Sequence, residues 1–327
     1  MTTNLEAQIR SQPEALTQML ESAAVRRQVH EAAEGLHRAR RIWVVGTGTS
    51  QHAAALGAAM IQEAGRSAHA VSSMQFVQHA PIVGPQDGVI VITHTAETAY
   101  ALAARSLAFQ AGLQVVMITK QESGFADAIE TVPKESSETY TVSYTAALVA
   151  IALLAAELGA ESVTEEKLAL VPGSVRNAIE ASGIGAVPTP QRLLAFIGSG
   201  PASWTAREGA LKVREAARFL AEGYDAEYFL HGSAVPLTPE DAIVLLTPPD
   251  PDGFLTALGT AAEAEGIAVS RLDEPSPLPV LLAQIPLAVR AQLLALRIAL
   301  ERGQDPDKVI VGAWDDAALW SLGSPTA

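Results

Sequence analysis

Three side chains that can transfer protons occur close together in residues 207–232. Lys212 and Glu215 are three residues apart, so they share one face if this stretch is helical. His231 directly precedes Gly232, in a loop that we expect to fold back over that face. A carboxylate, an ammonium group and an imidazole placed together can move protons, which makes this segment the candidate catalytic centre. The alternative is a solvated amphipathic helix followed by an unrelated histidine.

A turn rich in glycine and hydroxyl groups predicts an anion site. Apolar residues 42–45 predict a strand, Gly46-Thr47-Gly48-Thr49-Ser50 follows directly, and Ala-rich residues 51–64 predict a helix. This order places free backbone N–H groups and hydroxyls at a helix N-terminus, where anions bind. The glycines are not spaced as GxGxxG, so the dinucleotide-binding fingerprint is absent. The alternative is a tight turn that binds nothing.

A second turn of this kind follows the next predicted strand, residues 89–92. Its sequence is Thr93-His94-Thr95-Ala96-Glu97-Thr98, and a helix is predicted over residues 99–111. We interpret its hydroxyls as a second wall of the same anion pocket, although threonine also caps helices that bind no ligand.

The second half of the chain repeats the first. A predicted strand at residues 193–197 leads into Gly198-Ser199-Gly200, and these two glycines follow Gly46 and Gly48 at the same interval of 152 residues. Further strands are predicted at 113–119, 242–246 and 268–272, with helices at 142–158 and 288–302. Strands and helices that alternate in this way favour an α/β fold with a doubly wound parallel sheet in each half.

This pattern predicts three regions. Residues 1–41 form a helical segment, residues 42–181 a first domain and residues 191–327 a second domain, with a linker rich in glycine and proline at residues 182–190. In such sheets, ligands bind beyond the carboxyl ends of the strands, where the hydroxyl-rich turns lie.

Composition narrows the function further. The net charge is −14 and the basic residues form no cluster, which argues against nucleic acid as a partner. The absence of cysteine excludes disulfides and thiolate–zinc sites and is typical of a cytoplasmic protein. The start of the chain lacks the apolar stretch of a secretory signal, and the longest apolar run, residues 146–156, is shorter than the about 20 residues that span a membrane. His52, His69 and His79 lack ligand spacing, so we predict no metal and no other cofactor.

The chain resembles the proteins with a double sugar-isomerase (SIS) domain, especially the isomerase half of glucosamine-6-phosphate synthase and its stand-alone deaminase/isomerase relatives. The most specific match is EGALKVRE at residues 208–215, followed by Leu230-His231-Gly232. Gly48-Thr49-Ser50 and Glu97-Thr98 also match. The resemblance implies two tandem SIS domains with flavodoxin-like parallel sheets.

The resemblance also implies roles for individual residues. Glu215 would move the proton between C1 and C2 of a hexose phosphate, and Lys212 would stabilise the enediolate or keep Glu215 ionised. His231 would open the sugar ring, and because the neighbouring subunit often contributes this histidine, a homodimer is implied. The residues implied in binding the substrate phosphate are Gly48, Thr49, Ser50, Thr93, His94, Thr95 and Thr98, with His94 in place of the usual glutamine.

Some family features are changed. The usual Ser-Gln-Ser-Gly-Glu-Thr loop reads Thr-His-Thr-Ala-Glu-Thr, so we expect a tighter pocket and, at Ala96, a less mobile backbone. Thr141-Val142 stands where the family has threonine and lysine. The Leu-x-Lys element of the synthase tail is missing, and Lys308, the only lysine after Lys212, follows the aspartates too closely to replace it. The glutaminase half is absent from this sequence, so glutamine is not expected to donate nitrogen.

The leading hypothesis is therefore a sugar-phosphate isomerase or deaminase that acts on a phosphorylated amino sugar resembling glucosamine 6-phosphate. One alternative is a fructosamine-6-phosphate deglycase. The other is a non-catalytic sugar-phosphate sensor, which the altered loop and tail favour and the retained Lys212, Glu215 and His231 oppose. Burial would raise the pKa of Glu215 and Lys212 would lower it, and the sequence leaves the balance open.

Overall fold

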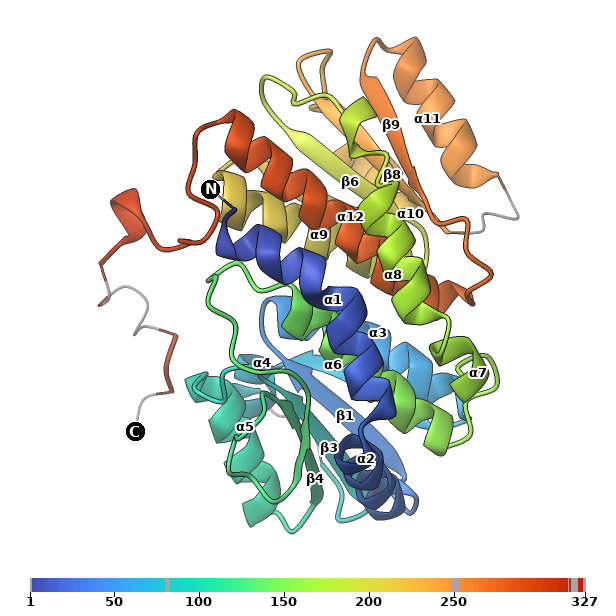
Figure 1. The fold of residues 1–327 in the computed structure, drawn as a ribbon, viewed down its shortest axis with the longest axis vertical. Helices are drawn as coiled ribbons and strands as arrows, with labels where there is room; N and C mark the ends of the chain where they lie inside the picture. The colour runs from blue at the N-terminus through green and yellow to red at the C-terminus, as the bar shows by residue number, and fades with distance from the viewer. Residues whose placement is uncertain (1, 80–82, 249–252, 317, 319–322, 326–327) are drawn as a thin grey trace. The chain divides into compact units, whose positions relative to one another are not determined.

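The computed structural model describes residues 2–79, 83–248, 253–316, 318 and 323–325 (Figure 1). The chain forms two compact units, each with its own parallel sheet. The β1–β5 unit comprises residues 14–135, 142–169 and 310–327, and the β6–β9 unit comprises residues 1–13, 136–141 and 170–309. The chain passes from one unit to the other five times.

The sheet of the β1–β5 unit has the order β2-β1-β3-β4-β5, with every strand parallel. This is the flavodoxin-like order. Beyond their first residues the central strands are mostly apolar, because both faces of a parallel sheet are buried. Three strands coincide with predicted ones, whereas β2 and β5 were not predicted, since β2 is half-exposed with the mixed sequence SAHAVS and β5 has three residues. The strands are β1 (Arg41–Gly46), β2 (Ser67–Ser72), β3 (Asp87–Ile92), β4 (Gln114–Thr119) and β5 (Ala128–Glu130).

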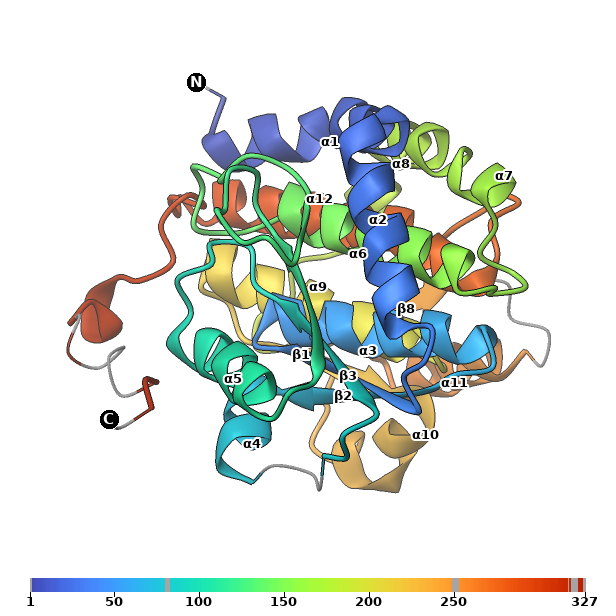
Figure 2. The same ribbon diagram turned by 90° about the horizontal axis from the view of Figure 1, so that it is seen from below.

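Helices cover both faces of this sheet (Figure 2). On one face, Phe76 of α4 and Ala101 and Ala104 of α5 pack against Val45 and Val89. On the other face, α3 packs closely against α6, where Gly57 adjoins Ile151. The helices of this unit are α2 (Ala23–Leu36), α3 (Thr49–Glu63), α4 (Ser73–Gln78), α5 (Ala99–Gln110), α6 (Val142–Glu157) and α7 (Glu165–Leu168).

The sheet of the β6–β9 unit has the order β7-β6-β8-β9, again fully parallel. Ile197 and Ile243 face α10 and α11, and Phe196 faces α9, because alternate residues of a strand point to opposite faces. The elements are β6 (Leu194–Gly198), β7 (Ala221–Asp225), β8 (Ala242–Thr247), β9 (Ala268–Asp273), α8 (Val171–Glu180), α9 (Ala202–Ala217), α10 (Ala226–Tyr228), α11 (Phe254–Ala264) and α12 (Val280–Glu301). Helix α1 (Asn4–Glu21) begins in this unit and ends in the other.

Helix α12 differs from its prediction. It begins at Val280, before the predicted residue 288, and contains Pro286 within its second turn. A proline inside a helix removes a backbone hydrogen bond, but burial against α9 and α8 holds the helix together around Pro286. By length and composition α12 is also apolar enough to cross a membrane, but 94% of its most apolar stretch is buried inside the protein, as in a core helix.

The two sheets repeat several details. β2-β1-β3-β4 and β7-β6-β8-β9 follow the same order. A Cβ on Gly46 would lie 2.3 Å from the Ser50 carbonyl oxygen, and one on Gly198 would lie 2.3 Å from that of Ala202. Each strand therefore turns into its helix through a contact that admits only glycine.

An ion pair is repeated as well. Arg41 donates two hydrogen bonds to the Asp87 carboxylate, of 3.2 and 2.8 Å, and Arg192 donates two to Asp241, of 2.9 and 2.6 Å. Both pairs lie at the amino ends of corresponding strands. The fold is thus α/β with two parallel sheets.

The limits of the units differ from the predicted domain limits at 181 and 191. Helix α8 belongs to the β6–β9 unit because it packs on α12, where Arg290 donates a hydrogen bond to the Ala181 carbonyl oxygen. Residues 136–141 also belong to this unit, since Glu138 N–H bonds the Asp307 carbonyl oxygen and Thr139 the Pro306 carbonyl oxygen. The periodicity of the sequence does not show where the chain passes back into a unit that it has already left.

Candidate functional site

Helix α9 carries the predicted Lys212 and Glu215, and the structure brings them together. The Lys212 Nζ lies 2.5 Å from Glu215 Oε2 and 3.5 Å from Glu208 Oε1. Lys212 and Glu208 are fully buried, and the Glu215 side chain is 22% exposed. One ammonium group is therefore placed between carboxylates from successive turns, of which only Glu215 reaches solvent.

Burial raises the pKa of Glu215 above its usual range. The charge and hydrogen bond of Lys212 oppose this effect, whereas the nearby Glu208 carboxylate adds to it. The sequence did not decide between the effects of burial and of Lys212, and in the structure burial dominates, so the pKa of Glu215 is raised. A carboxylate with a raised pKa is a stronger base than an ordinary glutamate and can take a proton from carbon adjacent to a carbonyl.

His231 lies apart from this pair along the chain. The stretch predicted as one loop contains the edge strand β7, the short helix α10 and a five-residue turn, Phe229–Ser233, in which His231 is exposed. Phe229 is buried in the core and its ring packs 5.5 Å from that of Tyr224, which anchors the turn. Among the described residues, the His231 side chain makes no hydrogen bond or ion pair, so its contact with Lys212 and Glu215 stays a prediction.

The two hydroxyl-rich turns of the β1–β5 unit flank one point of its sheet. They follow β1 and β3, which are neighbours, although the chain runs from β1 outward to β2 and from β3 to β4 on the other side. This is the topological switch point at which ligands bind in doubly wound sheets. The turns at residues 46–50 and 93–98 therefore lie at the same edge of the sheet, where an anion site was predicted.

The first turn leads into α3. Gly48 is its N-cap residue, has φ of 57°, and supplies no side chain to cap the helix. Thr47 Oγ1 and Ser73 Oγ are hydrogen bonded at 2.8 Å, which ties the turn to α4. Thr49 and Ser50 begin α3 and are half-buried. The N-terminal N–H groups of a long helix and two hydroxyls are thus gathered at one place, a suitable environment for an anion.

The second turn leads into α5. The buried Thr93 donates a 3.4 Å hydrogen bond to the Thr98 hydroxyl, and Thr95 Oγ1 accepts one of 3.2 Å from Glu97 N–H. Thr98 is the N-cap residue of α5, but its hydroxyl does not cap the helix. Ala96, where the family has glycine, has φ of 59°, in the left-handed region. A side chain there costs about 1–2 kcal/mol, so this loop is strained at the position where the sequence predicted a restricted backbone.

His94 is neutral in this loop at neutral pH. Burial lowers its pKa to about 4, and the charges of Lys120 and Lys134 act in the same direction. Its Nε2 accepts a 3.1 Å hydrogen bond from Glu135 N–H, which leaves the ring proton on Nδ1. Glu135 itself is buried and accepts hydrogen bonds from Val142 N–H and Ser143 N–H at the start of α6. His94 therefore anchors the turn to residue 135 and brings no positive charge to an anion.

The segment around Lys308 makes hydrogen bonds with the end of α9 and the start of α1. Arg218, at the end of α9, donates hydrogen bonds to Gln304 Oε1 at 2.8 Å and to the Lys308 carbonyl oxygen. The Asp307 carboxylate accepts hydrogen bonds from the first N–H groups of α1, at 2.9 and 2.7 Å. The Lys308 side chain is exposed and, within the described part of the chain, has no hydrogen bond or ion pair.

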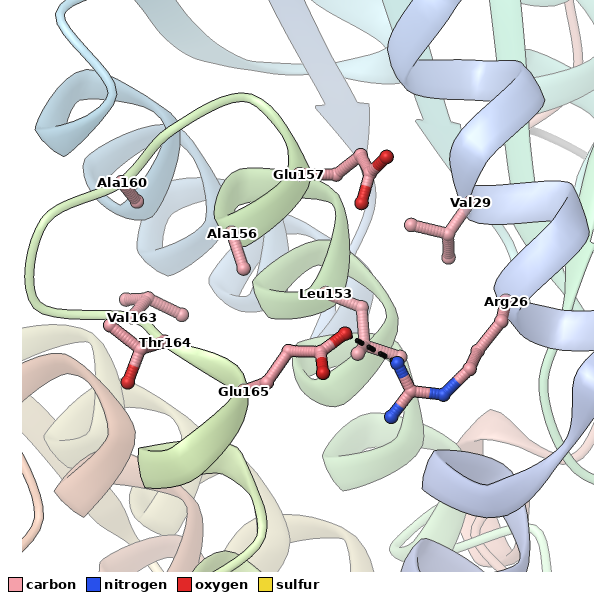
Figure 3. A pocket seen from close by; sticks show the side chains of 9 residues that line it. All are labelled: Arg26, Val29, Leu153, Ala156, Glu157, Ala160, Val163, Thr164 and Glu165. Carbon is pink, nitrogen blue, oxygen red and sulfur yellow. Dashed lines mark hydrogen bonds and ion pairs between the residues drawn. The ribbon is translucent and has the colours of Figure 1, made fainter.

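A cavity of about 360 Å³ lies elsewhere, between α2, α6 and α7 (Figure 3). Arg26 and Glu165 form an ion pair of 2.5 Å beside it, and its other lining residues are mostly apolar, such as Val29 and Leu153. It includes none of the predicted site residues. Among the described residues, no group of three or more histidine, aspartate or glutamate side chains is arranged to hold a metal ion.

Sequence reasoning missed several residues around these sites. Glu208 belongs to the EGALKVRE match but was given no role, although spacing by four places it beside Lys212. Lys120, Lys134 and Glu135 follow β4 and β5, and only the structure brings them to the turn after β3.

Comparison with known proteins supports the resemblance. Residues 35–157 match the SIS domain family. The glutamine–fructose-6-phosphate aminotransferase (isomerizing) of Pyrococcus horikoshii is 32% identical over 312 residues, covering 85% of this chain and 52% of that protein. The enzyme of the same name from Gloeobacter violaceus is 31% identical over 309 residues, covering 82% and 50%. The chain thus spans about half the length of these curated relatives.

Solved structures share the fold. Tagatose-6-phosphate ketose/aldose isomerase from Escherichia coli matches with a TM-score of 0.81 and 22% identity, covering 96% of this chain and 97% of that one. Glucosamine-6-phosphate deaminase from Thermotoga maritima matches with a TM-score of 0.76 and 19% identity, covering 93% and 97%. Residues 35–157 therefore carry a SIS domain, and the chain is homologous to the isomerase domain of the glutamine–fructose-6-phosphate aminotransferases.

Proposed function

We propose that this protein acts on a phosphorylated amino sugar resembling glucosamine 6-phosphate, opening its ring, transferring a proton between C1 and C2 and releasing the amine. The observation that carries this proposal is the Lys212–Glu215 pair on α9, in which a largely buried carboxylate with a raised pKa is held beside an ammonium group. Such a pair suits removal of a proton from carbon next to a carbonyl group.

His231 transfers a proton from the O1 hydroxyl to the ring oxygen, which gives the open-chain aldehyde. Glu215 takes the C2 proton, and the electron pair moves to the carbonyl oxygen, where Lys212 stabilises the negative charge. Glu215 returns the proton to C1 while a proton of the C2 amine passes to O1, which leaves an imine at C2 and a hydroxyl at C1. Water then adds to the imine and ammonia leaves, which gives the ketose phosphate. A deaminase and an isomerase share all steps except the last.

Phosphate binding is assigned to the two turns of the β1–β5 unit. The support is their position at the switch point and the uncapped starts of α3 and α5. Hydroxyls and backbone N–H groups bind phosphate without a broad basic surface, which agrees with the net charge of −14. The proposed ligands are Gly48, Thr49, Ser50, Thr93, His94, Thr95 and Thr98, with His94 acting through its neutral ring.

We further propose that the β6–β9 unit is a second SIS domain after the one in the β1–β5 unit, as the shared strand order and the equivalent Gly46 and Gly198 support. A homodimer is proposed as well, because His231 sits on an exposed turn that is available to a neighbouring subunit. The absence of the tail lysine fits a deaminase or isomerase better than a synthase.

The test is direct. Purified protein is incubated with glucosamine 6-phosphate, and ammonia and fructose 6-phosphate are measured, with unphosphorylated glucosamine and the Glu215→Gln variant as controls. We expect the wild-type protein to form both products from glucosamine 6-phosphate. We expect neither product from glucosamine, nor from the Glu215→Gln variant.

Other outcomes identify the alternatives. Release of an amino acid and a hexose 6-phosphate from fructosamine 6-phosphates, without reaction of glucosamine 6-phosphate, indicates a deglycase. Thermal stabilisation by several sugar phosphates without turnover of any indicates a sensor, a function that the strained Ala96 loop favours.

A further inference from the structure

Lysine is scarce in this protein. The chain has five lysines, at positions 120, 134, 167, 212 and 308, and a net charge of −14. Two of the five, Lys120 and Lys134, lie beside the turn of residues 93–98. Both reach it from the carboxyl edge of the same sheet, after β4 and after β5. Because the protein is acidic and has few lysines, the presence of two of them at the proposed anion site suggests that they bind the anion.

Lys120 is attached to the turn through its backbone. It directly follows β4, and its N–H donates a 3.1 Å hydrogen bond to the His94 carbonyl oxygen. Across the described residues its ammonium group has no hydrogen bond or ion pair. Its charge nevertheless reaches the turn, since it lowers the pKa of both His94 and Glu97.

Lys134 is attached through its side chain. Its Nζ lies 2.8 Å from Glu97 Oε1, and both side chains are largely in solvent, 49% and 65% exposed. The next residue, Glu135, donates its N–H to His94 Nε2 at 3.1 Å. An exposed ion pair of this kind contributes little to stability, so the Lys134 ammonium can leave Glu97 at small cost.

We propose that Lys120 and Lys134 are the cationic ligands of this site and make it selective for a dianionic phosphate monoester. The hydroxyls and N–H groups of the turn fix the position of the phosphate oxygens, and the two ammonium groups balance their charge. Lys134 exchanges Glu97 for the phosphate when the ligand arrives. The identity of the ligand rests on the proposed function, but its binding does not require turnover.

Lys134 has a simpler alternative role, in which it only neutralises Glu97 and keeps that carboxylate from repelling the phosphate. The two roles differ once Glu97 is uncharged. A lysine that only neutralises Glu97 loses its effect in a Glu97→Gln background, whereas a lysine that contacts phosphate keeps it.

The experiment measures the affinity for inorganic phosphate and for glucose 6-phosphate by calorimetry at neutral pH, with glucose as the uncharged probe. Lys120→Gln and Lys134→Gln are each expected to weaken binding by about tenfold, the effect of one charge-assisted contact near the surface. Lys167→Gln, in α7, is the matched control and is expected to leave the affinity unchanged. Lys134→Gln is also measured in the Glu97→Gln background, where a loss of about tenfold is again expected.

Wild-type affinity in both lysine variants would overturn the proposal, as would an effect of Lys134→Gln that vanishes in the Glu97→Gln background. An absence of phosphate binding by the wild-type protein would overturn it too. These results are independent of catalysis: a protein that binds phosphate through both lysines but turns over no amino-sugar phosphate refutes the proposed reaction and leaves this inference standing.

Discussion

In α9 the Lys212 ammonium lies 2.5 Å from the Glu215 carboxylate; the lysine is fully buried and the glutamate is largely buried. A buried ion pair gives little net stability, because desolvation offsets most of the attraction. Its retention in the interior is better explained by chemistry, since the same desolvation raises the pKa of Glu215 towards the range of a useful base. Both the proton transfer and the pH dependence of activity should therefore depend on Glu215.

Replacing Glu215 by Gln removes the proposed base while keeping the shape of the side chain. We expect kcat to fall at least about 100-fold with little change in KM, because the loss affects proton transfer and spares ground-state binding. Glu222→Gln, on the half-exposed face of β7, is the control and should retain full activity. A variant lacking Glu215 but with normal turnover would show that another residue removes the proton.

The pH dependence of kcat/KM should change when the charged neighbours of Glu215 are replaced, because they shift its pKa. Activity is expected to rise with pH through the raised pKa of Glu215, because only the ionised form accepts a proton. Lys212 lowers this pKa and Glu208 raises it, so Lys212→Met should move the acid limb to higher pH and Glu208→Gln to lower pH. Shifts in the same direction, or none, would exclude Glu215 as the titrating group. Circular dichroism checks that both variants are folded.

Asp241 should stabilise the fold in a pH-dependent way. Its hydrogen bonds from Arg192 hold its pKa below the ordinary value of 3.8. The contribution is therefore complete above that value and is lost as the pH falls through the lower, folded-state pKa. We expect Asp241→Asn to reduce the free energy of unfolding by about 2 kcal/mol at pH 7, with the difference from wild type narrowing below pH 3.8. Denaturant titrations at several pH values measure this, and the exposed Asp315→Asn should have no effect at any pH.

Ala96→Gly should stabilise the protein. Relief of the left-handed strain, about 1–2 kcal/mol, exceeds the added entropy of the unfolded chain, about 0.4–1 kcal/mol, so a net gain of up to about 1.6 kcal/mol is expected. Ala103→Gly, within α5, is the matched control and should destabilise by about 0.5–1 kcal/mol. Opposite signs in thermal or denaturant unfolding support the assignment, and a loss of stability in both variants contradicts it.

The sequence predicted features that depend on local pattern, and it did not predict contacts between residues that are far apart along the chain. Apolar runs such as residues 89–92 identify the central strands because these are buried on both faces, whereas β2 and β7 lie at sheet edges and carry no such run. The spacing of Lys212 and Glu215 predicted their contact because helical geometry is local. The neighbours of residues 93–98 were missed because they arrive from other strands. His94 was assigned to the phosphate with no sign in the sequence that Glu135 N–H holds its Nε2.

The five passages of the chain between its units also set the order in which the protein can fold during synthesis. Residues 14–135 and 142–169 are complete before β6 leaves the ribosome, so the β1–β5 unit can assemble most of its core early. Residues 1–13 are made before the strands of the β6–β9 unit but cannot complete their packing, because Gln12 bonds the side chain of Gln292 and the start of α1 is capped by Asp307. These contacts form only after almost all of that unit has been made.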